Sequence, residues 1–303
     1  MFYHVKELQY NAKPDQPDPV YAKKLQEVLG GQFGEITVMI QYLFQGWNCR
    51  GEQKYRDMLL DIGTEEIAHV EMLTTMIAQL LDNAPAREQE EAARNPIVNA
   101  VLGGTDVQES IIRTVLSGMN PQHGIVSGLG ATPTDSVGYP WNSRYTIASG
   151  NLLADFRANL NAESQGRLQV CRLYEMTTDK GVRDMLSFLI ARDTMHQNQW
   201  MAAIEELEMN QKATVPSTFP QDLEKQEVSY AFMNFSAGEE SKTGRWANGN
   251  SMDGQGKFEY VAKPTAMGQN PLLIPAPPYT HGTPPTPGQP TPQGVNDASY
   301  VTQ

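Results

Sequence analysis

The most constraining feature of this sequence is a motif that occurs twice. Residues 56–69 read RDMLLDIGTEEIAH and residues 183–196 read RDMLSFLIARDTMH, so the shared RDML and the final histidine both recur after 127 residues. In each copy an acidic residue precedes the histidine by three positions. The pairs are Glu66 with His69 and Asp193 with His196. Because residues three or four apart lie on one face of a helix, each copy sets a carboxylate beside an imidazole.

Both copies lie in long segments whose apolar residues recur with the period of an α-helix. The predicted helices span about 18–46, 52–82, 148–178 and 180–209. Short connections join the first to the second and the third to the fourth. Residues 83–147, rich in Gly, Pro, Asn and Ser, connect the two pairs. Two helix hairpins joined by one long crossover are a known bundle topology. The sequence therefore predicts an all-α fold, a ferritin-like four-helix bundle.

Three glycines, Gly30, Gly31 and Gly34, lie inside the first predicted helix. Each costs about 1 kcal/mol relative to Ala in a helix. We therefore expect tight packing, or the close approach of another helix, around these positions.

The helical periodicity ends near residue 210. Ten of the 20 prolines lie between Pro264 and Pro292, which excludes a helix there. The sequence thus predicts a catalytic bundle domain at 1–210. It predicts a partly irregular extension at 211–303, with an extended Pro-rich C-terminal tail. We expect the last twenty or so residues to be disordered or to form an arm across a neighbouring subunit.

Each motif copy has a matching acid on the preceding helix. Glu35 lies 31 residues before Glu66, and Glu163 lies 30 residues before Asp193. These acids interrupt or border apolar helix faces, where an isolated buried carboxylate costs several kcal/mol. Two divalent cations would remove this cost. A Glu from each of two helices and Glu-x-x-His from two more is the ligand plan of di-iron and di-manganese bundles.

Two further acids, Glu65 and Glu71, flank the first motif but fall off its apolar stripe. We expect both to face solvent, because charged residues on a helix usually occupy its exposed face.

Composition excludes several other classes of protein. A formal net charge of -12 argues against a nucleic-acid partner, whose phosphates require Lys and Arg. No run of about 18 apolar residues is present, so no membrane span is expected. The N-terminus lacks the pattern of a secretory signal. Cys49 and Cys171 are too few for a disulfide framework, and we expect a cytoplasmic protein with free thiols.

Four stretches of the chain resemble the manganese catalases. They read GGQFGEITVMIQYL, GTEEIAHVEML, NLNAESQGRLQV and RDMLSFLIARDTMHQ, and the resemblance extends from YNAKPDQPDP to about residue 240. The resemblance implies disproportionation of hydrogen peroxide to water and dioxygen. It implies two manganese ions per subunit, no haem, and a homohexamer whose tails wrap neighbouring subunits. No membrane partner is implied.

The same resemblance implies the residues of the metal site. The five manganese ligands would be Glu35, Glu66, His69, Glu163 and His196. Glu66 would bridge the metals. Glu35 and His69 would complete the shell of one metal, and Glu163 and His196 that of the other.

The resemblance also implies roles around the ligands. Tyr42 would hydrogen-bond to Glu35. In some members an arginine occupies the position of Ala162 and pairs with an acid at the position of Asp193. We therefore expect a more open or differently charged approach to the metals. Asp193 would either contact the ligands without binding a metal or take no part in metal binding. A calcium site would use Asp57, Asp61, Asn234, Ser236 and Gly238.

Two alternatives stay open from the residues alone. One is a di-iron oxidase or ferroxidase on the same scaffold, because carboxylates and imidazoles bind iron as well as manganese. The other is a coat or storage protein that binds metal without turnover. Metal analysis and an assay of oxygen release from peroxide distinguish these two functions from that of a manganese catalase.

Overall fold

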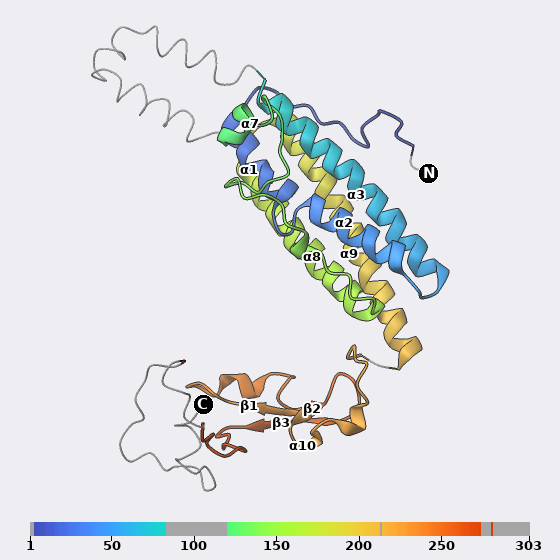
Figure 1. Ribbon diagram of the computed structural model, residues 1–303, viewed down its shortest axis with the longest axis vertical. Coiled ribbons are helices and arrows are strands. Elements are labelled where there is room, and N and C mark those ends of the chain that lie inside the picture. The colour runs from blue at the N-terminus through green and yellow to red at the C-terminus, as the bar shows by residue number, and fades with distance from the viewer. Residues whose placement is uncertain (1–2, 83–119, 213, 274–279, 281–303) are drawn as a thin grey trace, which may run out of the picture. The chain divides into compact units, whose positions relative to one another are not determined.

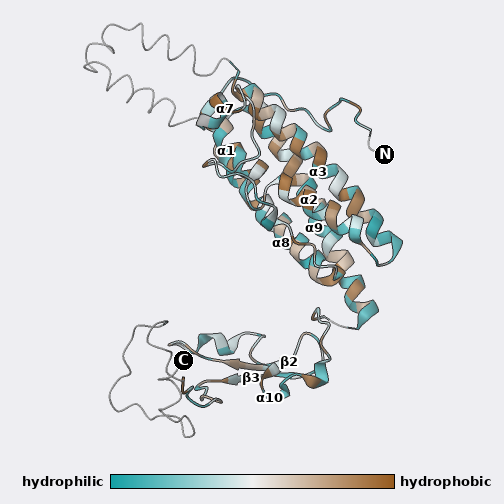
Figure 2. Ribbon diagram, viewed as in Figure 1, coloured by the Kyte–Doolittle hydropathy of each residue, from teal (hydrophilic) through white to brown (hydrophobic). Residues whose placement is uncertain are grey.

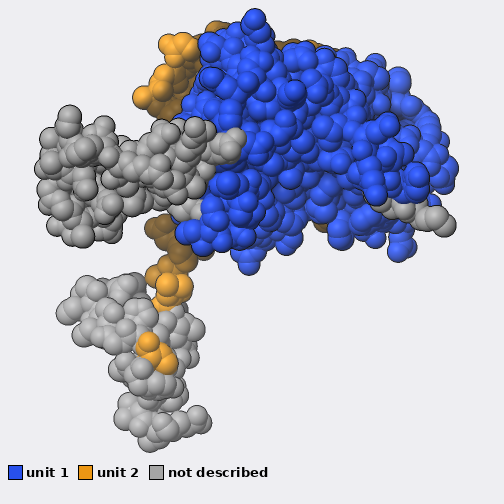
Figure 3. Space-filling view, turned by 90° about the horizontal axis from the view of Figure 1, so that it is seen from above, with its two compact units in different colours: residues 1–218 blue, residues 219–303 orange. Residues whose placement is uncertain are grey.

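The computed structural model of the chain describes residues 3–82, 120–212, 214–273 and 280. The chain forms two compact units, residues 1–218 and residues 219–303, which Figure 3 shows in different colours. The first unit contains the helix bundle. The assignment of residues 1–210 as a catalytic domain, with a tail that packs on neighbouring subunits, stays a prediction.

The first unit confirms the predicted bundle. Its main helices are α1 (Pro19–Gly30), α2 (Glu35–Asn48), α3 (Gln53–Leu80), α8 (Leu152–Glu175) and α9 (Lys180–Gln211). Two short elements, α7 (Pro121–Ile125) and a 3-10 helix (Ser143–Tyr145), belong to the described part of the crossover. In Figure 1, α3, α8 and α9 run side by side along the bundle. The segments α1 and α2 together take the place of the fourth long helix.

The prediction of one continuous first helix at 18–46 is wrong. The chain leaves the helix after Gly30 and re-enters it at Glu35. A Cβ on Gly30 would lie 2.4 Å from the carbonyl oxygen of Thr134, so the crossover backbone packs directly against this glycine. The three glycines therefore mark a break and a close approach of the crossover rather than a strained helix.

Side-chain caps define where three of the helices begin. Asp18 accepts a hydrogen bond from the backbone N–H of Tyr21, Asn151 from that of Ala154, and Asp179 from that of Val182. Such caps satisfy backbone donors that have no partner within the helix. They place the starts of α1, α8 and α9 close to the predicted positions.

Two apolar clusters form the core of the bundle. One contains residues of the C-terminal half of α3 and the N-terminal half of α9, including Leu73 and Leu186. The other contains residues from the opposite ends of the same helices, including Leu59 and Trp200. Figure 2 shows that each long helix carries both apolar and polar residues. On α3, α8 and α9, five buried residues lie between the two clusters and so occupy the middle of the bundle: Glu66, His69, Glu163, Asp193 and His196.

The described part of the crossover is fastened to the bundle by buried amides. The side chain of Gln26 on α1 donates to the carbonyl oxygens of Thr132 (2.7 Å) and Thr134 (2.8 Å). On α2, the side-chain amide of Gln45 donates to the carbonyl oxygen of Ile147 at 2.7 Å. These contacts satisfy buried backbone acceptors and hold the crossover against α1 and α2.

The second unit contains a small sheet that the sequence did not predict. Its strands are β1 (Ala231–Met233), β2 (Gly249–Asn250) and β3 (Lys257–Val261), in the order β1-β3-β2. The strand β3 pairs in parallel with β1, where Ala231 lies opposite Glu259, and antiparallel with β2. Its helical turns are Gln221–Leu223, α10 (Gln226–Ser229) and Glu240–Thr243. Strands this short carry too little alternation of apolar and polar residues to be recognised.

Most of the Pro-rich tail lies outside the described residues, so the expectation for the last twenty residues stays a prediction. Among the described residues, no helix is both long enough and apolar enough to cross a membrane.

Candidate metal centre

The five predicted ligands come together in the interior of the bundle. Glu35 begins α2, Glu66 and His69 lie on α3, Glu163 lies on α8, and His196 lies on α9. All five are buried, and the most accessible, Glu35, is 7% exposed. The folding of the duplicated hairpins thus converts two distant sequence motifs into one cluster.

The cluster consists of two groups that share one residue. Glu35, Glu66 and His69 offer ligand atoms within 4.8 Å of one another, and so do Glu66, Glu163 and His196. Each group could hold a metal ion. Asp193 belongs to neither group.

The two oxygens of the shared glutamate face different histidines. Oε2 of Glu66 lies 2.7 Å from Nδ1 of His69, and Oε1 lies 2.9 Å from Nδ1 of His196. Nδ1 of His69 is 3.8 Å from Oε2 of Glu35, and Nδ1 of His196 is 3.5 Å from Oε1 of Glu163. The imidazole rings stack with their centroids 5.8 Å apart. Both histidines therefore direct Nδ1 at the glutamates of the cluster, Glu35, Glu66 and Glu163.

Unpaired polar atoms at this point fit a metal site. Oε1 of Glu66 and Nδ1 of His196 are buried and have no partner with hydrogen-bond geometry. Leaving such atoms unsatisfied costs about 1–3 kcal/mol each, and more where the group is charged. Carboxylate oxygens and imidazole nitrogens are ligands that manganese and iron accept, so a cation between them would satisfy these atoms.

The pKa values reflect the crowding of charge. Burial and the neighbouring Glu66 raise the pKa of Glu35 to about 8. Burial also raises the pKa of Glu163. Burial alone would lower the pKa of His196, but Glu66 and Glu163 outweigh it and raise this pKa to about 12. Without a cation, protons provide the positive charge that these carboxylates need.

The structure corrects the partner of Tyr42. Its hydroxyl donates to Oε1 of Glu163 at 2.7 Å, not to Glu35 as the resemblance implies. Its ring packs against Trp200, with centroids 5.0 Å apart. Because α8 lies beside α2, the acid within reach of the hydroxyl is the one on α8.

The prediction that Glu65 faces solvent is wrong. Arg192 donates from Nε to Oε1 of Glu65 at 2.6 Å and from an Nη atom to Oε2 at 3.1 Å. Oε2 of Glu65 also lies 3.1 Å from Nε2 of His196, and Oε1 lies 3.7 Å from Nε2 of His69. The side chain of Gln9 donates to Oε1 at 2.8 Å. Burial alone would raise the pKa of Glu65, but the bonds from the histidines and Arg192 lower it.

A signal in the sequence could have identified this pair. Glu65 and Arg192 occupy the same position in the two motif copies and carry opposite charges. In a bundle built from two similar hairpins, equivalent positions face each other across the axis that relates them. By contrast, Glu71 bonds the exposed His4 at 2.9 Å and keeps a third of its side chain accessible, as predicted.

The environment of Asp193 is buried and acidic. The residue is 4% exposed, and burial together with Glu35 and Glu163 raises the pKa of its carboxyl well above the usual value. Ala162 is also buried and packs in the apolar cluster of Trp200. A small apolar side chain thus fills the position at which the resemblance implies an arginine in some members.

The predicted calcium ligands divide between the two units. Asp57 and Asp61 are exposed on α3, and Gln53 donates to Asp57 at 2.6 Å. Asn234 donates to the carbonyl oxygen of Gly238 at 2.9 Å and accepts from the backbone N–H of Ser236 at 3.0 Å. The calcium site stays a prediction.

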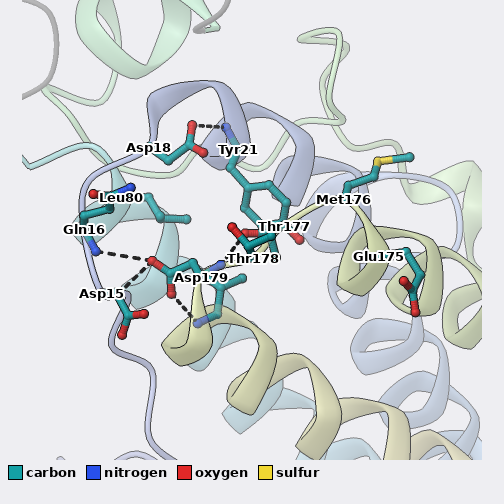
Figure 4. A pocket seen from close by; sticks show the side chains of 11 residues that line it. Asp15, Gln16, Asp18, Tyr21, Leu80, Glu175, Met176, Thr177, Thr178 and Asp179 are labelled. Carbon is teal, nitrogen blue, oxygen red and sulfur yellow. Dashed lines mark hydrogen bonds between the residues drawn. The ribbon is translucent and has the colours of Figure 1, made fainter.

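A cavity of about 530 Å³ lies beside the first turns of α1 and α9 (Figure 4). Three of its acidic residues, Asp15, Asp18 and Asp179, accept hydrogen bonds from backbone N–H groups. Asp18 accepts from Tyr21 at 2.9 Å, and Asp179 accepts from Asp15 at 2.8 Å. These bonds hold the N-terminal segment and the starts of α1 and α9 in place.

Known proteins resemble the chain over nearly its whole length. The sequence profile of the family described as manganese containing catalase matches residues 1–112 and 105–293. A manganese catalase of Bacillus subtilis is 60% identical over 283 residues, which cover 93% of this chain and 98% of that protein. The uncharacterized protein YjqC of Bacillus subtilis is 66% identical over 287 residues, covering 94% of this chain and 98% of that protein.

A solved structure agrees with the fold. The crystal structure of KatB, a manganese catalase from Anabaena, aligns with a TM-score of 0.64 and 26% identity, covering 87% of this chain and 100% of that one. The chain therefore belongs to the manganese catalase family.

Proposed function

We propose that this chain disproportionates hydrogen peroxide at two manganese ions held by Glu35, Glu66, His69, Glu163 and His196. The observation that carries the proposal is the position of Glu66, whose two carboxylate oxygens face Nδ1 atoms of histidines from the two motif copies. A carboxylate placed in this way can bridge two cations. When bound, the manganese pair supplies the two-electron store by which two peroxide molecules become two water molecules and one dioxygen.

The protein's own residues divide the work of holding the site. Glu35 and His69 would bind one ion, and Glu163 and His196 the other, with Glu66 shared. The bundle keeps these groups buried, which excludes bulk water and strengthens each electrostatic contact. Tyr42 holds Glu163 through its hydroxyl.

Asp193 would lie beside the site without binding a metal. Its absence from both ligand groups supports this role. Without bound metal, its raised pKa favours the protonated carboxyl. Ala162 leaves the approach on this side without the charge of an arginine.

A di-iron oxidase or a non-catalytic metal store on the same scaffold is not favoured. The ligand geometry suits iron as well as manganese. The high identity to a manganese catalase of Bacillus subtilis favours manganese.

Calcium binding, a homohexamer and a cytoplasmic location complete the proposal. Asp57, Asp61, Asn234, Ser236 and Gly238 supply oxygen atoms, which calcium prefers. Calcium analysis and the mass of the native particle in solution test the first two, and cell fractionation tests the third.

The decisive experiment combines metal analysis with oxygen release. We expect two manganese ions per subunit in the purified protein and release of dioxygen from peroxide. Glu66→Ala should lose both, because the shared carboxylate is removed. Glu71→Ala, which removes a partly exposed acid outside the cluster on the same helix, should keep both. Full activity in Glu66→Ala, or iron in place of manganese in the active protein, would reject the proposal.

A further inference from the structure

We infer that Glu65 is a positioning residue that orients both histidines of the metal centre, His69 and His196, so that their Nδ1 atoms face the manganese ions. The inference rests on the proposed function and adds a residue to it. Glu65 belongs to neither group of clustered ligand atoms, so its effect would pass through the two imidazoles.

Two consecutive glutamates of α3 lie on opposite sides of both imidazoles. Glu66 approaches the Nδ1 atoms at 2.7 and 2.9 Å. Glu65 lies behind the rings, 3.1 Å from Nε2 of His196 and 3.7 Å from Nε2 of His69. The second distance is slightly longer than a hydrogen bond, and Nε2 of His69 has no other partner. Glu65 is thus the acceptor that both rings face.

The chemistry of metal binding explains why an acceptor is needed there. A neutral histidine that binds a metal through Nδ1 carries its remaining proton on Nε2. Both His69 and His196 are completely buried, so water does not supply an acceptor for that proton. A carboxylate behind the ring fixes the tautomer and the ring orientation and raises the basicity of the metal-binding nitrogen.

Arg192 keeps the carboxylate of Glu65 in position. Its guanidinium donates to both oxygens, at 2.6 and 3.1 Å, and such two-point contacts restrict the orientation of a carboxylate. Gln9 adds a third donor at 2.8 Å. A carboxylate can accept about four hydrogen bonds, so these three leave room for the fourth, from Nε2 of His196 at 3.1 Å, while Nε2 of His69 faces Oε1 at the longer distance of 3.7 Å.

A hollow gives access to Glu65 from outside. It has a volume of about 580 Å³, and its lining includes Gln9, Thr64, Glu65, Phe188 and Arg192. The side chain of Glu65 is 18% exposed and that of Arg192 is 33% exposed. A small carboxylate could therefore enter the space that a shorter side chain at position 65 would leave.

The test measures manganese affinity, by competition with a chelator, in the full-length protein and three variants. Glu65→Gln should weaken manganese binding about 10–100-fold, the usual effect of removing a carboxylate behind a metal-bound histidine. Glu65→Asp should give an intermediate loss, because it keeps the charge for Arg192 but draws the carboxylate away from the rings. The control Glu71→Gln should bind manganese like the unsubstituted protein. Circular dichroism of the metal-free proteins monitors folding.

A second arm uses Glu65→Ala with added formate. Formate should raise the manganese affinity of Glu65→Ala at least tenfold, because it can occupy the vacated space next to Arg192. Chloride at the same ionic strength should not. Equal recovery with both salts, or none with formate, would overturn the inference.

The outcomes separate this inference from the proposed function. An unsubstituted protein that binds no manganese would reject the proposed function itself. If the manganese affinity of Glu65→Gln is within twofold of that of the unsubstituted protein, only the role of Glu65 is overturned. If Glu65→Gln does not fold, Glu65→Asp decides by the same criterion.

Discussion

The hydroxyl of Tyr42 on α2 donates a hydrogen bond to Oε1 of Glu163 on α8 at 2.7 Å. Both residues are buried, and the bond joins the two hairpins of the bundle at the metal centre. It restricts the carboxylate of Glu163, which also lies 3.5 Å from Nδ1 of His196. Position 42 therefore acts on the half of the centre that belongs to the second hairpin.

Tyr42→Phe should lower oxygen release about tenfold while manganese remains bound. A hydrogen bond to a charged group contributes about 1.5–3 kcal/mol, and its loss leaves Glu163 less well held. Oxygen electrode measurements and metal analysis check this. Tyr10→Phe is the control, because the hydroxyl of Tyr10 contacts Asp184 instead. Activity of Tyr42→Phe within twofold of the unsubstituted protein would contradict the role.

Asp193→Asn should keep both manganese ions. The residue is buried beside the centre but lies outside both groups of clustered ligand atoms, so an amide of the same shape can replace it. Metal analysis of the purified variant checks the expectation. His196→Ala, which removes a predicted ligand on the same helix, is the comparison and should lose manganese. Loss of one manganese ion from Asp193→Asn would make Asp193 a ligand.

Removing manganese with a chelator should lower the melting temperature. Bound metal stabilises only the folded state, by about 2.7 kcal/mol when its free concentration is 100 times its Kd. Differential scanning calorimetry with and without added manganese measures the shift. The same shift should be absent in Glu66→Ala. Identical melting of the metal-free and metal-loaded proteins would contradict a buried metal pair.

Stability should fall in mild acid because of His123. Burial and Lys23 lower the pKa of this histidine to about 4. Nε2 of His123 lies 3.0 Å from Oε1 of Gln26, while Nδ1 is buried without a partner, so a second proton there would be unsatisfied.

The direction of the pH effect on stability follows from the difference between the folded and unfolded pKa of His123. Because the folded pKa lies below the unfolded value of about 6.5, the contribution is complete above that pH and is lost as pH falls towards 4. Its size is at most about 3 kcal/mol. Urea unfolding at pH 7 and pH 4.5 should show a larger loss in the unsubstituted protein than in His123→Gln. Equal losses would contradict the shifted pKa.

Gly30→Ala should destabilise the bundle by about 2 kcal/mol or more, because the added Cβ would lie 2.4 Å from the backbone of Thr134. Backbone atoms cannot move aside as a flexible side chain can, so the crossover has to shift. Thermal unfolding measures the loss. Gly130→Ala is the control, since its nearest contact would be 3.4 Å. Equal stability of the two variants would show that the crossover adapts freely at Thr134.

The sequence alone predicts the helices, the bundle and the set of acids and histidines. The duplicated motif and the apolar stripes identify which residues of α3, α8 and α9 face inward, because the helical period relates sequence spacing to direction. The caps of α8 and α9 are visible as Asn151 and Asp179. These local patterns predicted a metal centre because its residues lie on or beside the predicted inward faces, and the family resemblance then implied the five ligands without Asp193.

Tertiary packing decided the rest. The break between α1 and α2 depends on the crossover pressing against Gly30, and the partner of Tyr42 depends on which helix lies beside α2. Glu65 sits one position from Glu66, about 100° around the helix, at the edge of the inward face. Whether such an edge residue meets water or a neighbouring helix depends on how closely and at what rotation α9 packs against α3. Helical periodicity specifies the direction of a side chain on its own helix, but only the packed bundle specifies what stands opposite it.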